Sequence, residues 1–413
     1  MGEAPPPARR LEALHGALQR SLRGAGVALR RVDQENPVPP EACLPFEAEG
    51  GLLVRRERCP RRTRWGRTFL RGTEEVDDEL LAALAPGFAS EGQRWRRKVV
   101  YLDAETTGLG GGTGNYAFLV GWVVAYPTGE LRLEQVLLRD EADEPAMLER
   151  LHEVLADATM LVTYNGKSFD LPLLRNRRVM NRMTPFEEPP HIDLLHVARR
   201  VHKKRHFKKS LTTLEKEVLA FDRGPDDVAG EEVAFRYLDY LRSGDARPLA
   251  GVVDHHRHDI WSLVALLGVY GSENRIEVCD WPSVARNLGR VGQPLRAAEL
   301  ARRAVESSGE VDALRAQGEI AKRGRQFDLA LRSFEAVADR GQDDPWLRLE
   351  LAKLYEHRRR DPAAALRWVE RGVAGSVREV ERRKARLLRK LGLSRVADLA
   401  RDNHSFDDSE RSG

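Results

Sequence analysis

The sequence predicts an α/β domain followed by an all-α domain of helical repeats. Between residues 98 and 270, short apolar runs of strand length alternate with longer segments in which apolar residues recur at helical spacing. After residue 272 the strand-like runs end, and small and apolar residues recur in a repeated helical pattern. A chain of 413 residues is long enough for two or three domains.

We therefore predict four parts along the chain. They are an Arg/Pro-rich extension that packs on the core (1–95), the α/β domain (96–272), the helical repeats (273–400) and a disordered tail (401–413). Within the extension, GGLLVRRERCP has the composition of a strand. DDELLAALAPG reads as a short helix that ends at its Pro-Gly pair.

The α/β domain begins with three successive strands over residues 98–105, 116–126 and 131–138. Pro-Thr-Gly marks the turn between the second and the third. A helix over 144–155 and a fourth strand over 160–163 follow. Further helices are expected from about residue 170, up to Leu219, over 231–241 and over 249–270. Either Ser210 or Thr212 caps the helix that ends at Leu219, and Thr212 would form a capping box with Glu215.

Composition indicates a soluble, globular protein of a reducing compartment. Hydrophobic residues make up 41% and charged residues 32%, and the longest apolar run, 116–126, is too short to span a membrane. Cys43, Cys59 and Cys279 form no Cys-x-x-Cys pair, so neither a zinc ribbon nor a disulfide framework is expected. The pI of about 9.0 mildly favours a polyanionic partner. We expect a cytoplasmic location and no membrane partner.

Four carboxylates stand where a divalent metal site would need them. Asp103 and Glu105 end an apolar strand two positions apart, so both side chains lie on one face. Asp170 follows the fourth strand, and Asp259 lies on the last helix with His255 one turn before it. Hard divalent cations prefer such oxygen ligands, so the pattern predicts a metal-dependent hydrolytic site.

These motifs resemble those of the DEDD exonucleases, the DnaQ-like branch of the ribonuclease-H-like superfamily. They are DAETTGLG, YNGKSFD and HHRHDIWSL, in that order. Together with HIDLL and SLTTLEKEVL, they are most similar to the bacterial YprB-type ribonuclease-H-like domain, over residues 47–270. The resemblance implies a mixed sheet flanked by helices. It also implies a 3′–5′ exonuclease that hydrolyses terminal phosphodiesters of single-stranded nucleic acid.

The resemblance also assigns roles to the site residues. Two ions, Mg²⁺ or Mn²⁺, would be bridged by Asp103. Glu105 and Asp259 would complete the ion on the side of the attacking water, and Asp170 would anchor the ion at the leaving group. His255 would orient and deprotonate the water, since an imidazole titrates near neutral pH. Its spacing, four residues before Asp259, follows the YprB-type pattern.

For the other polar residues around these motifs, we weigh a functional role against a structural one. His256 and His258 either exchange roles with His255 or are ordinary polar residues on the other faces of the helix. Asn165 either donates hydrogen bonds near the site or is a plain turn residue in Asn-Gly. Asp193 in HIDLLH is read as a helix N-cap rather than a carboxylate that supports the site.

Substrate contacts are expected from three places. The turn GLGGGTG is not a P-loop, but small residues there let backbone amides approach a terminal nucleotide. The second motif and the basic run KKRHFKK offer hydrogen bonds, phosphate contacts and a stacking ring. The candidates are Thr106, Gly108, Tyr164, Asn165, Phe207 and Lys208.

The region after residue 272 resembles tetratricopeptide repeats. Ala297, Ala301 and Ala304 occupy the small positions of a second repeat helix, and residues 330–338 and 365–373 repeat the spacing after a one-residue shift in the last copy. Lys353 stands where a small residue is expected. We expect a protein- or substrate-binding role for this region. Alternatives to the exonuclease are an endonuclease on the same fold, or an inactive scaffold that binds nucleic acid or protein through its repeats.

Overall fold

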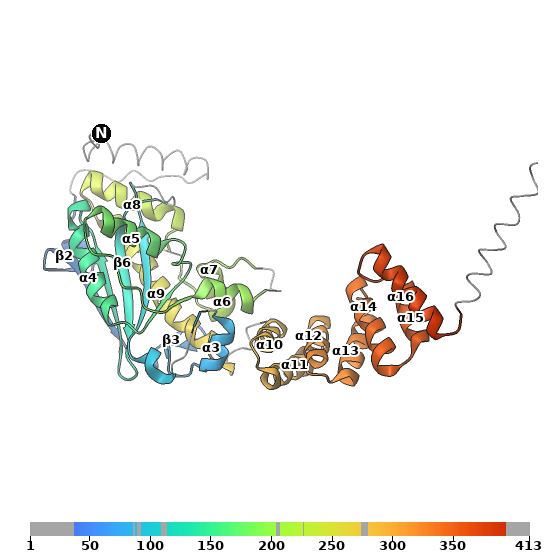
Figure 1. Cartoon of the computed structure of the whole chain (residues 1–413). Helices are drawn as coiled ribbons and strands as arrows, with labels where there is room; N and C mark the ends of the chain where they lie inside the picture. Colours follow the sequence, from blue (N-terminus) through green and yellow to red (C-terminus); the bar gives the residue numbers. More distant parts are fainter. Residues whose placement is uncertain are drawn as a thin grey trace, which may run out of the picture. The chain divides into compact units, whose positions relative to one another are not determined.

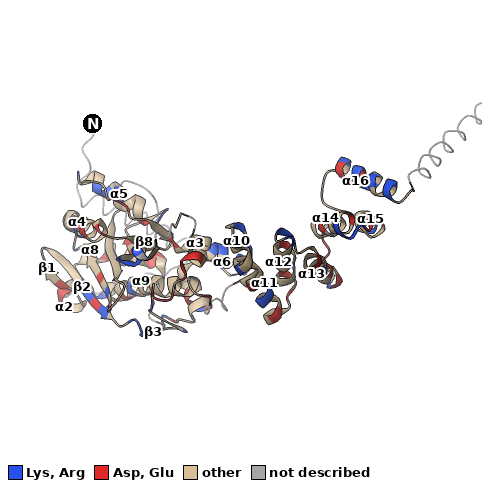
Figure 2. Cartoon of the chain, turned by 60° about the horizontal axis from the view of Figure 1, so that its bottom comes forward, with Lys and Arg blue, Asp and Glu red and all other residues tan. Residues whose placement is uncertain are grey.

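The computed structural model describes residues 37–85, 87–88, 92–108, 114–203, 207–225, 227–273 and 280–393. Its contacts divide the chain into two compact units, Met1–Asp280 and Trp281–Gly413, which Figures 1 and 2 show from two directions. The first unit contains the sheet and the second is helical, so the predicted fold class is confirmed. The predicted tail, 401–413, lies outside the described residues.

A mixed sheet of seven strands forms the centre of the described part of the first unit, in the order β1-β2-β7-β6-β5-β8-β9. β5 pairs with β8, and β8 with β9, in parallel, while the other pairs are antiparallel. The strands are β1 (Glu47–Glu49), β2 (Leu52–Cys59), β5 (Val99–Thr106), β6 (Ala117–Ala125), β7 (Leu131–Leu137), β8 (Met160–Thr163) and β9 (His191–Asp193). β3 (Arg64–Trp65) and β4 (Thr68–Phe69) form a separate hairpin.

The helices of this unit follow the predicted order. They are α2 (Pro40–Cys43), α3 (Asp78–Leu84), α4 (Glu144–Ala156), α5 (Asp170–Met180), α6 (Leu194–Val201), α7 (Leu211–Leu214), α8 (Gly230–Ser243) and α9 (Ala250–Tyr270). α7 continues into a π-helical turn, η3 (Glu215–Leu219). Ser210, not Thr212, is the N-cap of α7, because its side chain accepts the amide of Thr213. The capping box with Glu215 is therefore wrong, and Glu215 has other partners.

β1 and β2 belong to the sheet, although they precede the predicted division at residue 95. β2 pairs with β7 over seven residues, from Leu53 opposite Leu137 to Cys59 opposite Leu131. Leu52, Leu53 and Val54 are buried in the main core. The segment read as a strand from its composition thus extends the sheet. Cys43 and Cys59 are free thiols.

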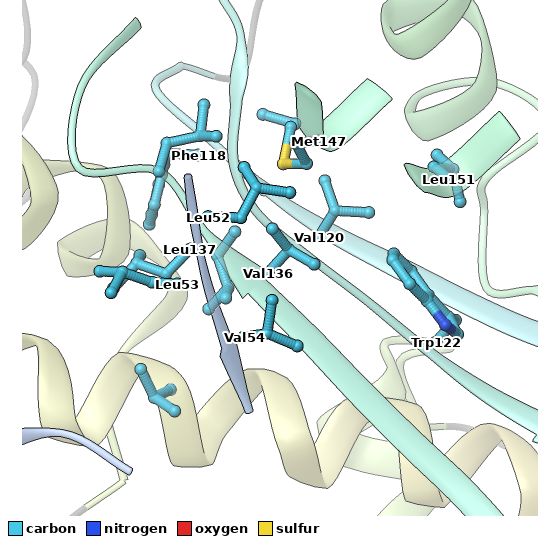
Figure 3. Packing of buried hydrophobic residues seen from close by; sticks show 14 of the residues in the cluster. Leu52, Leu53, Val54, Phe118, Val120, Trp122, Val136, Leu137, Met147 and Leu151 are labelled. Carbon is cyan, nitrogen blue, oxygen red and sulfur yellow. The ribbon is translucent and has the colours of Figure 1, made fainter. Parts of the chain in front are cut away.

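The two faces of the sheet are covered by different helices, and this separation places the site. β6 is buried along its whole length. Val120 and Trp122 of β6 pack on the α4 side with Met147 and Leu151 (Figure 3). Gly121 between them points to the opposite face because side chains alternate along a strand. There α9 approaches closely: a Cβ on Gly121 would lie 2.6 Å from Ile260 and 2.7 Å from His256.

The second unit is a series of helices. They are α10 (Trp281–Arg290), α11 (Pro294–Ser308), α12 (Val311–Arg323), α13 (Phe327–Asp339), α14 (Pro345–Leu354) with the π-helical turn η6 (Tyr355–Arg359), α15 (Pro362–Glu370) and α16 (Val377–Lys390). Many of the positions expected to be small or apolar are buried, among them Ala297, Ala330, Phe334 and Ala365, whereas Gly372 is exposed and Val305, Ala338 and Val373 are half-buried. Lys353 is half-buried and pairs with Glu350. The tetratricopeptide assignment itself stays a prediction. Among the described residues, no helix is both long and apolar enough to cross a membrane.

Candidate metal centre

The end of β5 directs two carboxylates toward α9. Asp103 lies directly opposite Gly121 in the antiparallel β5–β6 pair, and residues opposite each other share a face of the sheet. Asp103 therefore faces α9, and Glu105, two residues further on, faces the same way. The register shifts between Glu105 and Thr106, which is a bulge that turns the end of the strand.

Asp170 and Asp259 come to the same place from two helices. Asp170 is the first residue of α5, directly after the turn that follows β8, and Asp259 lies midway along α9. Ligand atoms of Glu105, His255 and Asp259 lie within 4.8 Å of one another. The charges of Asp259, Asp170 and Glu105 all raise the pKa of Asp103, so these carboxylates lie near one another. The structure thus brings together the five residues that the sequence singled out.

The carboxylates repel each other; Asp170 and Asp259 are buried, and Asp103 and Glu105 are half-buried. Burial, followed by the charges of Asp259 and Asp170, raises the pKa of Glu105 to about 8. Burial likewise raises the pKa of Asp170 to about 7, with Asp193 and Asp259 adding to the shift. Asp103 has a pKa well above its ordinary value for the same reasons, burial first. Such a cluster favours a cation that compensates its charge.

Arg223 is the cation that opposes this repulsion, and sequence reasoning missed it. Its guanidinium donates to Asp259 and, at 2.6 and 2.7 Å, to both carboxylate oxygens of Glu215. Glu215 also accepts from the hydroxyl of Ser262, which in turn accepts from the Trp65 indole at 2.9 Å. The Ser of the HxRxDxxSL motif therefore helps to hold Glu215, which holds Arg223 against Asp259.

A second missed carboxylate contacts His255. Asp227 Oδ1 lies 2.8 Å from Nδ1 of His255, and Arg223 Nη1 lies 3.0 Å from the same nitrogen. Only one of these contacts is a hydrogen bond, since the carboxylate can only accept and the guanidinium can only donate. We assign the Nδ1 proton to the bond with Asp227, because the carboxylate is closer. Nε2 then carries the lone pair, and it lies 3.5 Å from Asp259 Oδ2.

His256 and His258 have structural roles, through hydrogen bonds and ring packing respectively. Nε2 of His256 donates to the carbonyl of Asp103 at 3.0 Å, and Nδ1 accepts from the side-chain amide of Gln135 at 3.0 Å. His256 is fully buried rather than on a solvated face, and burial lowers its pKa to about 4. His258 packs against the rings of Trp65 and Phe221, and burial lowers its pKa to about 4 as well. Both imidazoles are neutral at physiological pH.

The turn of the second motif is built on Asp193. Its carboxylate accepts the amides of Asn165 at 2.8 Å and Lys167 at 3.2 Å, and it caps α6 through the amide of Leu195 at 3.0 Å. The N-cap reading of Asp193 is confirmed. Asn165 has a φ of 64°, a left-handed conformation that suits Asn in an Asn-Gly turn. The Tyr164 hydroxyl donates to the carbonyl of Lys209, which ties this turn to the basic run.

The remaining substrate-binding candidates make local contacts. Thr106 donates to the carbonyl of Gly108 at 3.0 Å, and a Cβ on Gly108 would lie 2.8 Å from Asn115. Phe207 packs on His202 and carries Lys209 over its ring, whereas Lys208 is exposed. The rest of the glycine-rich turn, 109–113, and residues 204–206 of the basic run lie outside the described residues. Substrate contact by these residues stays a prediction.

The donor set fits a hard divalent cation. Several carboxylates gather near Arg223 and His255; among them are Asp103, Glu105, Asp170, Glu215, Asp227 and Asp259. Oxygen ligands in this number suit Mg²⁺ or Mn²⁺, and neither Cys43 nor Cys59, the two cysteines among the described residues, belongs to the set. Asp103, Glu105, Asp170 and Asp259 are the side chains that would hold the metal.

Comparisons with known proteins found similarity over part of the chain. Residues 100–270 match the sequence model of the RNase H superfamily. An uncharacterized protein of Bacillus subtilis (strain 168) named YprB is 38% identical over 174 residues. That match covers 41% of this chain and 41% of the relative, so the chain matches about two fifths of the relative's length. The first match and the mixed sheet with its flanking helices show that residues 100–270 are similar to RNase H superfamily domains and have an RNase H-like fold.

Proposed function

We propose that this chain is a metal-dependent nuclease that removes nucleotides from the 3′ end of single-stranded DNA or RNA. The observation that carries the proposal is the meeting of Asp103, Glu105, Asp170 and Asp259. They come from three segments far apart in the sequence and converge on one face of the sheet. The RNase H superfamily match supports nuclease chemistry, and the order of the motifs supports the exonuclease branch.

The residues at the site suit hydrolysis of a phosphodiester by water. The four carboxylates would hold two divalent ions, and such ions supply Lewis acidity to a phosphate oxygen and lower the pKa of water. Nε2 of His255 would accept a proton from the attacking water. Asp227 at Nδ1 keeps Nε2 unprotonated beforehand and stabilises the imidazolium afterwards. Arg223 holds Asp259, so this ligand does not need to reorient.

The test is a time course on 5′-labelled single-stranded DNA and RNA, with Mg²⁺, Mn²⁺ or EDTA. We expect a metal-dependent ladder that shortens from the 3′ end. Asp103→Asn should lower the rate by about a thousandfold or more, since a lost ligand removes several kcal/mol of transition-state stabilisation. Asp254→Asn is the matched control: Asp254 lies on α9 next to His255, is exposed, and pairs only with Arg55 among the described residues.

The same assay separates the alternatives. A substrate whose 3′ end is blocked should resist cleavage; internal cuts in it would mean an endonuclease on the same fold. If neither metal supports cleavage, or if Asp103→Asn cleaves as fast as Asp254→Asn, the catalytic assignment is wrong. A scaffold that acts through the helical unit would then be the better description.

A further inference from the structure

The last helices of the second unit carry a concentrated positive charge. Residues 356–390 contain twelve Lys and Arg against five Asp and Glu, a net charge of +7, whereas the whole chain has a net charge of only +4. The rest of the chain is therefore slightly acidic. Figure 2 shows Lys and Arg following one another along α16. A charge excess of this size on two neighbouring helices calls for a local explanation.

Internal ion pairs neutralise only part of this charge. Glu356 is buried at the start of η6 and accepts from three cations of α16: Arg383 at 3.1 Å, Arg386 at 2.7 Å and Lys390 at 2.9 Å. One carboxylate thus faces three cations, and these contacts fix the orientation of α16 around its axis. The first turn is fixed by a capping box between Ser376 and Glu379. α16 is therefore a firmly held helix rather than a loose basic tail.

A second set of arginines on α16 takes no part in the ion pairs with Glu356. Arg378, Arg382 and Arg389 are spaced by four and seven residues, so they lie on one stripe that extends about 16 Å along the helix. All three are exposed. Among the described residues, no carboxylate lies within ion-pair distance of any of them. Aligned guanidinium groups that repel one another lower stability unless an anion compensates them.

A groove continues this stripe toward α14. It has a volume of about 400 Å³ and opens between α14, the segment before α16, and α16 itself. Lys353 lines it from α14, and Arg382, Arg383 and Arg386 line it from α16. Glu379 is the carboxylate at its edge, and its oxygen accepts from the amide and hydroxyl of Ser376 at 2.8 Å. The groove therefore presents cations on two walls.

We propose that the stripe on α16 and the adjoining groove bind the phosphate backbone of nucleic acid. A polyanion with regularly spaced charges matches aligned arginines better than separate small anions do. Guanidinium groups also bind phosphate in a bidentate manner. Such contacts hold a strand without reading its sequence. The proposal rests on the proposed nuclease function, because it supplies that enzyme with a second contact to its substrate.

The test measures binding without cleavage. The full-length protein is titrated in EDTA against 5′-fluorescein single-stranded DNA and RNA of about 30 nucleotides, longer than a typical single-strand site. Arg378→Glu, Arg382→Glu and Arg389→Glu combined should weaken binding at least tenfold. The slope of log Kd against log salt should fall by about 2, since each lost phosphate contact contributes about 0.7 for single strands. Replacing the same arginines by lysine should preserve the slope.

The control variant makes the same change in charge at another place on the second unit. Arg323→Glu, Arg332→Glu and Arg340→Glu combined change three exposed arginines of α12 and α13 that have no ion pair among the described residues. If this control weakens binding as much as the stripe variant, or if the stripe variant binds like the unmodified protein, the proposal is overturned. Stripe-dependent binding to vesicles of anionic phospholipid, with unchanged binding of oligonucleotide, would overturn it too.

The metal-dependent cleavage assay separates this inference from the nuclease proposal. If the unmodified protein binds the oligonucleotide through the stripe but never cleaves it, the nuclease proposal fails and the binding surface stands. If it cleaves, but the stripe variant has the same Kd and salt slope as the unmodified protein, the nuclease proposal stands and the binding surface is rejected.

Discussion

At the scale of single residues, the histidine of the site depends on a carboxylate that belongs to none of the motifs. Asp227 accepts the Nδ1 proton of His255 and so leaves the lone pair on Nε2, the nitrogen that faces Asp259. Without that acceptor, Arg223 at 3.0 Å would favour the opposite tautomer, with Nδ1 unprotonated. Asp227 is thus a positioning residue rather than a metal ligand.

Asp227→Asn should lower kcat about 10- to 100-fold, as the loss of a partner that orients a site residue typically does. The metal concentration needed for half-maximal activity should change little, because the ligands are untouched. Nitrogen-15 NMR of the imidazole provides a readout that does not depend on activity, since the protonated nitrogen should change from Nδ1 to Nε2. Asp222→Asn, in the same loop but exposed, is the control. An unchanged tautomer in Asp227→Asn would refute this role.

The residues that the sequence predicted and those it missed differ in their local context. The common orientation of Asp103 and Glu105 followed from the alternation along a strand, which the β5–β6 register bears out. Arg223 and Asp227 lie in a loop between η3 and α8, where no periodicity tells which way a side chain points. Glu215 lay within SLTTLEKEVL, but local capping rules suggested Thr212 as its partner. A contact with Arg223, eight residues away, replaced that pair.

At the scale of elements, helix contacts in the second unit depend on small residues. Gly318 of α12 faces the ring of Phe334 on α13, and a Cβ there would overlap the ring. In an unhindered helix, Gly→Ala stabilises by roughly 0.5–1 kcal/mol. At Gly318 the overlap makes the same substitution destabilising, because overpacking a core typically costs about 1–3 kcal/mol.

Gly318→Ala should therefore lower the melting temperature of the second unit, measured by calorimetry on the full chain. Gly289→Ala in α10 is the matched control, since its added Cβ would meet the nearest atom at 3.6 Å, an ordinary contact. That variant should melt at the same temperature or higher. Equal melting temperatures for the two variants would show that α12 and α13 do not approach each other as closely as the structure has them.

Helices and strands were predicted correctly where hydrophobic periodicity was strong. The pairing of strands could not be predicted in this way. The strand at Met160–Thr163 and the start of α5 at Asp170 were predicted at their observed positions. Composition suggested a strand near Leu52–Cys59 but not its partner. Its pairing with β7, more than seventy residues later in the sequence, is a long-range contact that no local pattern contains.

At the scale of the whole molecule, the carboxylate cluster links the stability of the first unit to pH and metal. The pKa of Glu105 is raised from an ordinary 4.5 to about 8, and that of Asp170 from 3.8 to about 7. Between the ordinary and the raised pKa of each group, the folded state therefore binds more protons than the unfolded state. The stabilisation is complete below about pH 4 and is lost as the pH rises through 7 and 8.

In EDTA, the melting temperature of the first unit should fall between pH 6 and pH 9. The free energy of unfolding should decrease by on the order of 1 kcal/mol per pH unit for each group that titrates. Mg²⁺ or Mn²⁺ should reduce the fall, because a metal binds the deprotonated carboxylates and stabilises only the folded state. Glu105→Gln removes one titrating group, so its melting temperature in EDTA should depend less on pH and respond less to metal. A melting temperature in EDTA that stays constant or rises over this range would contradict the clustering of the carboxylates, because separated carboxylates keep ordinary pKa values and are already ionised at pH 6.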